Sequence, residues 1–360
     1  ILEPPISKVG ASCSRLIIIP DGELGLIPWE SLKWKGKPLM YTYPVSYAPT
    51  LATLSLLRSS ERNYAGVARL PLIAFGGAYY KSSTAENKKT IAILDPGARE
   101  AQLAGILSRG YRESGWDDLP GARDEAIRVS SAYYKEGADR DAALCSGIWA
   151  SENAVKSFNT GLNSRNISGK AVKLDSFRII HFATHGEAVP EFPETSRIIL
   201  TQSDAIPLSE KKLIAEYFPS FADEDGSLLA AEIIGLSSKA DLVVLSACET
   251  GKGKVTATEG IVGLTRSWMV AGANGVVVSL WKVNDTGTRV FMTIFHEMVA
   301  HGVEPGEAIV RTQKMFESGQ WQTGEFAPGK TYIEDGTAYK YSRLNFSAPY
   351  YWAAFQYWGK

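Results

Sequence analysis

FRIIHFATHG, at residues 177–186, and DLVVLSACETG, at residues 241–251, are built alike. Each contains a short apolar run rich in β-branched residues, and such a run is typical of a buried strand. A reactive side chain and a glycine follow each run: His185 precedes Gly186, and Cys248 is followed by Glu-Thr-Gly. We therefore predict two buried strands whose carboxyl ends carry a histidine and a cysteine.

Similar apolar runs recur elsewhere and are separated by helical patterns. The further predicted strands lie at residues 15–20, 71–75, 197–200 and 276–280, and the clearest predicted helices at 123–134, 259–271, 285–300 and 305–317. Strands that are apolar throughout and alternate with helices favour a mainly parallel sheet covered on both faces. The sequence therefore predicts an α/β fold.

The composition is that of an ordinary globular protein, with 45% hydrophobic and 21% charged residues in a chain of 360. A formal net charge of −1 gives no overall field that would favour nucleic acid or an anionic membrane as a partner. No apolar run approaches the ~20 residues that a membrane-spanning helix requires. Three cysteines are too few for a disulfide framework and indicate a reducing compartment, so we expect a cytoplasmic protein.

The cysteine and the histidine suit one another chemically. Active sites of open α/β sheets form beyond the carboxyl ends of strands, so neighbouring strands would place Cys248 beside His185. The imidazole would accept the thiol proton and later protonate the leaving amine. The backbone N–H groups of Gly186 and Cys248 are the candidates for an oxyanion hole. The pattern predicts nucleophilic catalysis by Cys248 with His185 as its base.

Simpler interpretations apply to other reactive residues. A lone cysteine is often a small buried hydrophobe, and we interpret Cys13 and Cys145 in that way. His181 shares a strand face with His185 but would stand ~13 Å from it, too far to share one metal ion. We therefore interpret His181 as a packed core histidine and expect neither a metal site nor a cofactor.

One motif points to a different class of function. GEFAPGKT, at residues 324–331, matches the phosphate-binding pattern G-x-x-x-x-G-K-[ST]. That pattern works between a strand and a helix, whereas here a helical pattern and a polar segment precede it and no helical pattern follows. A nucleotide-binding switch is therefore a third hypothesis, which titration with a labelled nucleotide would test.

Longer segments resemble the CHAT family. SACETG is similar to the Q-A-C-x-G signature of caspases, which does not transfer between families by itself. The resemblance to CHAT domains extends from about Arg15 to Trp358 and rests on segments that occur there in the same order: IIIPDGELGLIPWESL, KPLMYTYPVSYAPTLATLSLL, LPGARDEA, HFATHG, LVVLSACETG, EGIVGLTRSWMVAGANGVVVSLWKVND and PYYWAAFQYWG.

The resemblance implies a fold and a reaction. CHAT domains resemble caspases and separases, which implies a caspase-like three-layer α/β sandwich. Its amino-terminal pseudo-protease half would be residues 1–138 and its catalytic half residues 139–360, with a polar, turn-rich stretch at 82–121 near the boundary. The resemblance makes Cys248 the nucleophile and His185 the base of a cysteine endopeptidase.

The resemblance also implies partners. CHAT domains often follow TPR repeats, and this chain starts at Ile1 rather than Met, so we expect a TPR-type region or an activating partner in the whole protein. CHAT peptidases often act in prokaryotic antiviral defence, which implies a protein substrate such as a gasdermin or a CRISPR-associated protein. We expect no direct contact with nucleic acid or membrane.

A basic substrate side chain is implied by SLWKVND at residues 279–285. This segment resembles the separase segment whose last Asp lines the pocket for a P1 arginine, and Asp285 has that position here. Glu249 and Glu259 are further candidates for the pocket, and Ser246 stands where metacaspases have an acidic residue. A carboxylate would select a basic P1 side chain through a charge-assisted pair. The alternative interpretation is that Asp285 caps the following helix.

Two functions follow from the resemblance. The first is an endopeptidase that makes limited cuts after a basic P1 residue. The second is a catalytically silent CHAT scaffold that only binds protein partners. The presence of both His185 and Cys248, each followed closely by a glycine, favours catalysis.

Overall fold

The protein is described by a computed structural model. It describes residues 6, 13–59, 62–80, 116, 118–163, 165–221, 224–246, 249–250, 258–322, 324–327, 329–334 and 337–360. Cys248 lies outside these residues.

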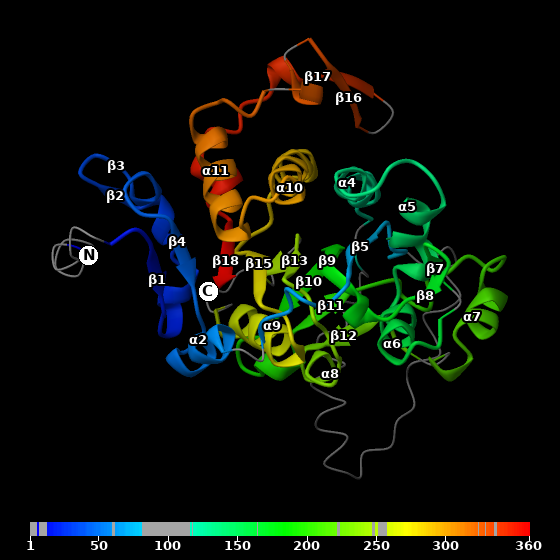
Figure 1. Ribbon diagram of the computed structural model, residues 1–360. Coiled ribbons are helices and arrows are strands. Elements are labelled where there is room, and N and C mark those ends of the chain that lie inside the picture. The colour runs from blue at the N-terminus through cyan, green and yellow to red at the C-terminus, as the bar shows by residue number, and fades with distance from the viewer. Residues whose placement is uncertain are drawn as a thin grey trace.

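An eight-stranded sheet forms the centre of the molecule (Figure 1). In spatial order its strands are β1 (Leu16–Ile18), β4 (Val45–Tyr47), β18 (Phe355–Gly359), β15 (Gly275–Ser279), β13 (Leu242–Leu245), β9 (Phe177–Ala183), β5 (Leu70–Gly76) and β6 (Leu144–Cys145). Its neighbouring strands pair in parallel except for β15 with β18. The predicted α/β fold with a mainly parallel sheet is therefore confirmed.

Smaller sheets surround the central one. A four-stranded sheet has the order β12 (Ser227–Leu229), β11 (Arg197–Ile199), β10 (His185–Ala188) and β14 (Glu249–Thr250). The predicted strand at 197–200 therefore belongs to this second sheet. Two-stranded sheets are formed by β2 (Lys33–Trp34) with β3 (Lys37–Pro38), β7 (Asn166–Ile167) with β8 (Lys170–Ala171), and β16 (Thr331–Glu334) with β17 (Thr337–Lys340).

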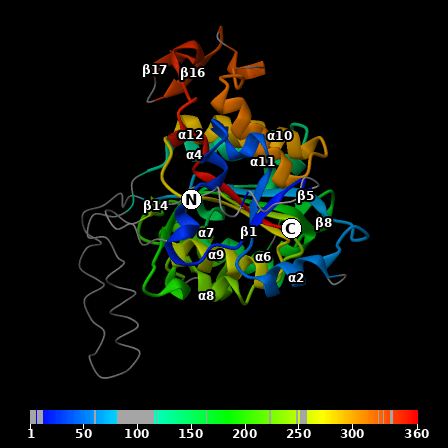
Figure 2. The ribbon, with the colours of Figure 1, turned by 90° about the vertical axis from the view of Figure 1, so that its left-hand side faces the viewer.

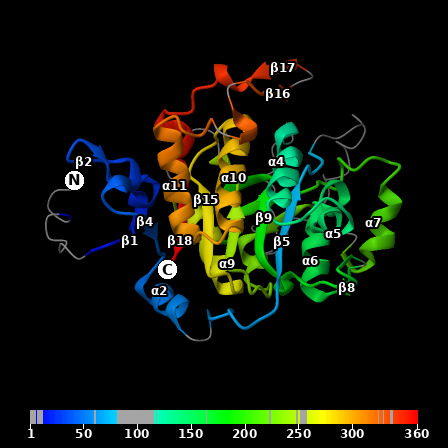
Figure 3. The same ribbon diagram turned by 45° about the horizontal axis from the view of Figure 1, so that its top comes forward.

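Helices lie on both sides of the central sheet, as Figure 2 shows edge-on and Figure 3 from above. One side carries α4 (Pro120–Ser131), α10 (Asp285–Ala300), α11 (Pro305–Glu317) and α12 (Pro349–Trp352). The other carries α2 (Leu51–Arg58), α6 (Glu152–Thr160), α8 (Ala230–Ile233) and α9 (Thr258–Ala271). Two further α-helices, α5 (Ala138–Ala143) and α7 (Lys211–Tyr217), lie beside β6 and α6 (Figure 3). None of the helices described is long and apolar enough to cross a bilayer.

The alternation of side chains along β13 explains why its sequence is apolar throughout. Leu242 and Val244 belong to the hydrophobic core under α4 and α10, whereas Val243 and Leu245 belong to the core on the opposite side. Successive residues of a strand point to opposite faces, so a strand between two cores has no face for polar side chains. This is the physical reason that LVVL could be recognised as a buried strand.

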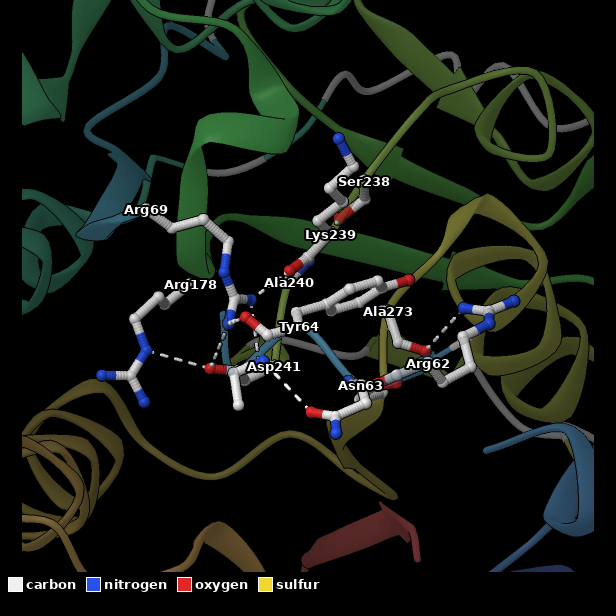
Figure 4. A network of polar contacts seen from close by, with 12 residues as sticks. Arg62, Asn63, Tyr64, Arg69, Arg178, Ser238, Lys239, Ala240, Asp241 and Ala273 are labelled. Atoms are coloured by element: carbon white, nitrogen blue, oxygen red, sulfur yellow. Dashed lines mark hydrogen bonds and ion pairs between the residues drawn. The ribbon is translucent and has the colours of Figure 1, made fainter. Parts of the chain in front are cut away.

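An ion-pair network fixes the amino ends of the strands that lead to the predicted site (Figure 4). Asp241 directly precedes β13, and its carboxylate binds Arg69 before β5 at 2.9 Å and Arg178 in β9 at 2.9 Å. Arg69 also donates to the carbonyl oxygens of Lys239 and, at 3.1 Å, Tyr64. One carboxylate thus joins three neighbouring strands and helps to fix their register.

Candidate active site

The strand that leads to Cys248 lies beside the strand that leads to His185. β13 and β9 pair in parallel, with Leu245 opposite Phe182. The backbone N–H of Ser246 then donates to the carbonyl oxygen of Phe182 at 3.0 Å, which continues the pairing past the end of β13. The predicted adjacency of the two strands is therefore correct.

A second pair of strands forms on the other side of Cys248. β14 pairs in parallel with β10, with Glu249 opposite Glu187 and Thr250 opposite Ala188. Within the predicted oxyanion hole, Gly186 lies in β10 opposite Ile198 of β11, and Cys248 lies outside the described residues. The described backbone on both sides of Cys248 therefore follows the segment that contains His185.

Two aromatic rings enclose the imidazole of His185, which is 2% exposed. The ring centroid of Tyr80 lies 4.7 Å away in a T-shaped arrangement, and that of Trp116 lies 5.1 Å away. Tyr80 Oη accepts the backbone N–H of His185 at 3.3 Å and donates to the carbonyl oxygen of Ile199 at 3.3 Å. Burial raises the pKa of Tyr80 above its ordinary value, so the hydroxyl stays protonated and can donate. Sequence reasoning did not identify either aromatic residue.

A pocket adjoins His185. It is small, with a cavity volume of about 40 Å³, and is lined by residues from α4, from the end of β9 and from the segment between β15 and α10. Charged residues in its wall are Glu125, Lys282 and Asp285, and Ser246 also lines it. The pocket therefore brings ionisable side chains beside the predicted base.

Asp285 lies in this pocket at the first residue of α10. It does not cap the helix: the side chain of Asn284 does so by accepting the N–H of Gly287 at 2.9 Å. The carboxylate of Asp285 is half-buried, and the position that a Cβ of Gly121 would take is 2.9 Å from its Cβ. The carboxylate of Asp285 is therefore part of the pocket wall. The alternative interpretation, that Asp285 caps the helix, is wrong.

The two other predicted pocket carboxylates are placed differently. Glu249 has its backbone in β14, and its side chain lies outside the described part of the structure. Glu259 lies exposed in the first turn of α9, and it is not among the described residues that line the pocket beside His185.

A chain of buried polar groups leads away from the pocket. Glu125 of α4 is 4% exposed and accepts hydrogen bonds from Ser246 Oγ and, at 3.0 Å, from His181 Nε2. His181 Nδ1 lies 3.1 Å from His296 Nε2, and His296 Nδ1 lies 3.0 Å from the hydroxyl of Tyr133. Burial and, secondarily, the neighbouring His181 hold the pKa of His296 well below its ordinary value. His181 is buried as expected, but it is part of a polar chain that the sequence did not reveal.

One group of carboxylates elsewhere has the spacing of metal ligands: Glu152, Glu224 and Glu232. The ammonium of Lys156 lies 2.8 Å from a carboxylate oxygen of each one. Burial raises the pKa of Glu152 to about 8. The cluster is therefore arranged around the Lys156 ammonium, which lies among the three carboxyl groups where a metal ion would otherwise have to bind.

The segment GEFAPGKT does not have the surroundings of a phosphate loop. Gly324–Phe326 form a 3-10 helix, and Thr331 begins strand β16. The motif is thus followed by a strand and not by the helix that its chemistry requires.

Comparison with known proteins identifies the family. A sequence model of the CHAT domain matches residues 1–360. The chain belongs to the CHAT domain family. This family is related to caspase-like cysteine peptidases, which agrees with the resemblance in the sequence.

Two curated relatives are also similar to this CHAT domain. Tetratricopeptide repeat protein 28 of Homo sapiens is 24% identical over 326 residues, which are 84% of this chain and 11% of the human protein. Tetratricopeptide repeat protein 28 of Mus musculus is 30% identical over 126 residues, 35% of this chain and 5% of the mouse protein. The CHAT domain thus spans only a small part of these relatives, whose names are consistent with the expected TPR-type region.

Proposed function

We propose that this CHAT domain is a cysteine endopeptidase that makes limited cuts in a partner protein, with Cys248 as nucleophile and His185 as base. The observation that carries the proposal is the backbone pairing on both sides of Cys248. Ser246 bonds to Phe182, and Glu249 lies opposite Glu187. Adjacent strands lie about 4.8 Å apart, so the described residues before and after Cys248 run directly beside the segment that carries His185, which supports the proposed pair.

The surroundings of His185 suit a base in this reaction. The imidazole accepts the thiol proton, and the thiolate attacks the substrate carbonyl while the N–H groups of Gly186 and Cys248 stabilise the oxyanion. The imidazolium then protonates the leaving amine, and the neutral ring activates the water that hydrolyses the thioester. The rings of Tyr80 and Trp116 hold the imidazole in place and exclude water from it.

The substrate is proposed to carry a basic P1 side chain. Asp285 lines the pocket that contains His185, and the side chain that caps α10 is that of Asn284 instead. A carboxylate in a confined pocket pairs with a guanidinium or an ammonium and disfavours an acidic side chain. Asp285 is therefore the first proposed P1 carboxylate.

The finer fold and the cellular role are part of the same proposal. The fold is proposed to be a caspase-like sandwich with a pseudo-protease half at residues 1–138 and a catalytic half at 139–360. The partner is proposed to be a gasdermin or a CRISPR-associated protein that is cut in the cytoplasm during prokaryotic antiviral defence.

Incubation with candidate partner proteins, followed by sequencing of new termini, tests the proposal. We expect Cys248→Ala and His185→Ala to lower kcat/KM by on the order of 10³-fold or more, because each removes one member of a catalytic pair. Cys13→Ala is the matched control and should keep the wild-type rate.

Alkylation provides an independent measurement. Iodoacetamide should label Cys248 well before Cys145, whose thiol pKa is raised to about 11 by burial. Full cleavage by Cys248→Ala, or equal labelling of all cysteines, would contradict the dyad. Partner binding without any cut by the wild type would instead identify a catalytically silent scaffold.

A further inference from the structure

Glu125 is a second carboxylate in the pocket beside His185. It lies on α4, four residues after Gly121, and residues at this spacing share one face of a helix. Gly121 is packed against Asp285, and Gly121, Glu125 and Asp285 all line the pocket. Glu125 and Asp285 therefore line the same pocket, and Gly121, which packs against Asp285, lies about one helical turn, roughly 5.4 Å, from Glu125 along α4.

The two carboxylates differ in their surroundings. Asp285 is half-buried, whereas Glu125 is only 4% exposed. Both hydrogen bonds of Glu125 end on Oε1, and among the described residues none ends on Oε2. Within the described residues, Oε2 is therefore the oxygen of Glu125 that remains for a donor or a cation in the pocket.

All the hydrogen bonds of the polar chain behind Glu125 can form at once with a single arrangement of protons. His296 is neutral because its pKa lies well below the ordinary value, and burial keeps the hydroxyl of Tyr133 protonated by raising its pKa. The Tyr133 O–H then donates to His296 Nδ1, His296 Nε2–H donates to His181 Nδ1, and His181 Nε2–H donates to Glu125. Every ring nitrogen is used, and Glu125 at the end of the chain is an acceptor.

The formal charges of the described residues in the pocket wall do not cancel. Glu125 and Asp285 each contribute a negative charge, and Lys282, an exposed residue of the same wall, contributes one positive charge. Among the described residues of the wall, one formal negative charge therefore remains, which a single guanidinium or ammonium would neutralise. Ser246 ties Glu125 to the segment that leads into Cys248, so this charge lies close to the predicted nucleophile.

We propose that Glu125 binds the side chain of a P1 arginine together with Asp285, an inference that rests on the proposed endopeptidase function. A guanidinium presents five N–H donors in a planar fork and can contact two carboxylates at once. A lysine ammonium is a compact point charge and gains less from the second carboxylate. The pocket therefore selects arginine over lysine, and both over neutral side chains.

Peptide kinetics test this assignment. The substrates are identical peptides with Arg, Lys or citrulline at P1, where citrulline keeps the shape of arginine without its charge. We expect the wild type to prefer Arg over citrulline by at least a hundredfold in kcat/KM. Glu125→Gln keeps an oxygen for Ser246 and His181, and it should reduce that preference at least tenfold by lowering kcat/KM for the Arg peptide. Glu136→Gln, an exposed position paired with Arg140, is the matched control and should change neither.

A binding measurement separates this inference from the proposed function. Benzamidine, a small amidinium, is titrated into the Cys248→Ala protein by calorimetry, so catalysis is not required. Glu125→Gln in that background should weaken binding at least tenfold, and Glu136→Gln should not. If no peptide is cut but benzamidine binding depends on Glu125, the endopeptidase proposal fails and the cation pocket stands.

The opposite results overturn the assignment of Glu125. Equal cleavage of the Arg and citrulline peptides by the wild type contradicts a charged pocket without the need for any variant, so a poorly folding Glu125→Gln does not weaken the test. If Glu125→Gln cleaves the Arg peptide as fast as the wild type and benzamidine binding is also unchanged, Glu125 has no role in P1 binding. The charge that selects arginine is then that of Asp285 alone.

Discussion

The indole ring of Trp116 lies against the imidazole of His185, with the ring centroids 5.1 Å apart and the ring planes at 37°. Tyr80 covers the same imidazole in an edge-on contact. His185 is therefore held by contacts with aromatic side chains as well as by its place at the start of β10. Such enclosure fixes the orientation of a base.

Replacement of Trp116 tests whether this contact positions the base. We expect Trp116→Leu to lower kcat about tenfold with little change in KM, and to move the acid side of the pH–rate profile to lower pH. The reason is that the imidazolium loses the face of an aromatic ring, a contact of roughly 0.5–2 kcal/mol. Trp34→Leu, a half-buried tryptophan beside β3, is the control. A loss of rate with an unchanged pH profile would indicate only a structural role for Trp116.

Gly121 controls the space beside Asp285. A Cβ at this position would lie 2.9 Å from the Asp285 Cβ, closer than such atoms approach one another in proteins. Gly121→Ala should therefore displace Asp285 and lower the preference for a basic P1 side chain at least fivefold, although alanine favours the helix by roughly 1 kcal/mol. Selectivity is measured with the Arg and citrulline peptides.

The matched control for this change is Gly66→Ala. Nothing lies within 4 Å of a Cβ at Gly66, so the same substitution there should leave selectivity unchanged. Unaltered selectivity in Gly121→Ala would show that Asp285 does not contribute to P1 binding.

The central strands could be predicted because both their faces are buried. The run at 242–245 is β13 itself, and the run at 177–182 lies within β9. The run at 197–200 has the same character, yet it forms β11 opposite β10 in the second sheet. An apolar run indicates a strand but not its neighbours, because several pairings would bury it equally well.

The site could be predicted only in part. Active sites of open α/β sheets form at the carboxyl ends of strands, and this rule was enough to predict that His185 and the strand leading to Cys248 belong to one site. The polar chain could not be predicted, because it joins residues that are distant in sequence: Glu125 and His181 are 56 residues apart, and His181 and His296 are 115 apart. Their contacts depend on how α4 and α10 pack on the sheet, which local patterns do not specify.

His296 should make the folding stability depend on pH. Burial, then the neighbouring His181, depresses its pKa in the folded protein well below the ordinary value of 6.5. Below about pH 6.5 the unfolded chain therefore binds a proton at His296 that the folded chain does not bind. The contribution of neutral His296 to stability is complete above this pH and is lost as the pH falls. The loss approaches about 1.4 kcal/mol per pH unit.

Denaturant unfolding at pH 7.5, 6.0 and 5.0 measures this dependence. The groups in contact with His296 are His181 and Tyr133, and Glu125 lies beyond His181 in the same chain. We expect the free energy of unfolding to fall less steeply with acid in His296→Gln than in the wild type, whatever its value at pH 7.5. His301→Gln, an exposed histidine after the same helix, should keep the wild-type slope. Equal slopes for the wild type and His296→Gln would mean that His296 takes up its proton without unfolding, and the proton arrangement assigned to the chain behind Glu125 would then be wrong.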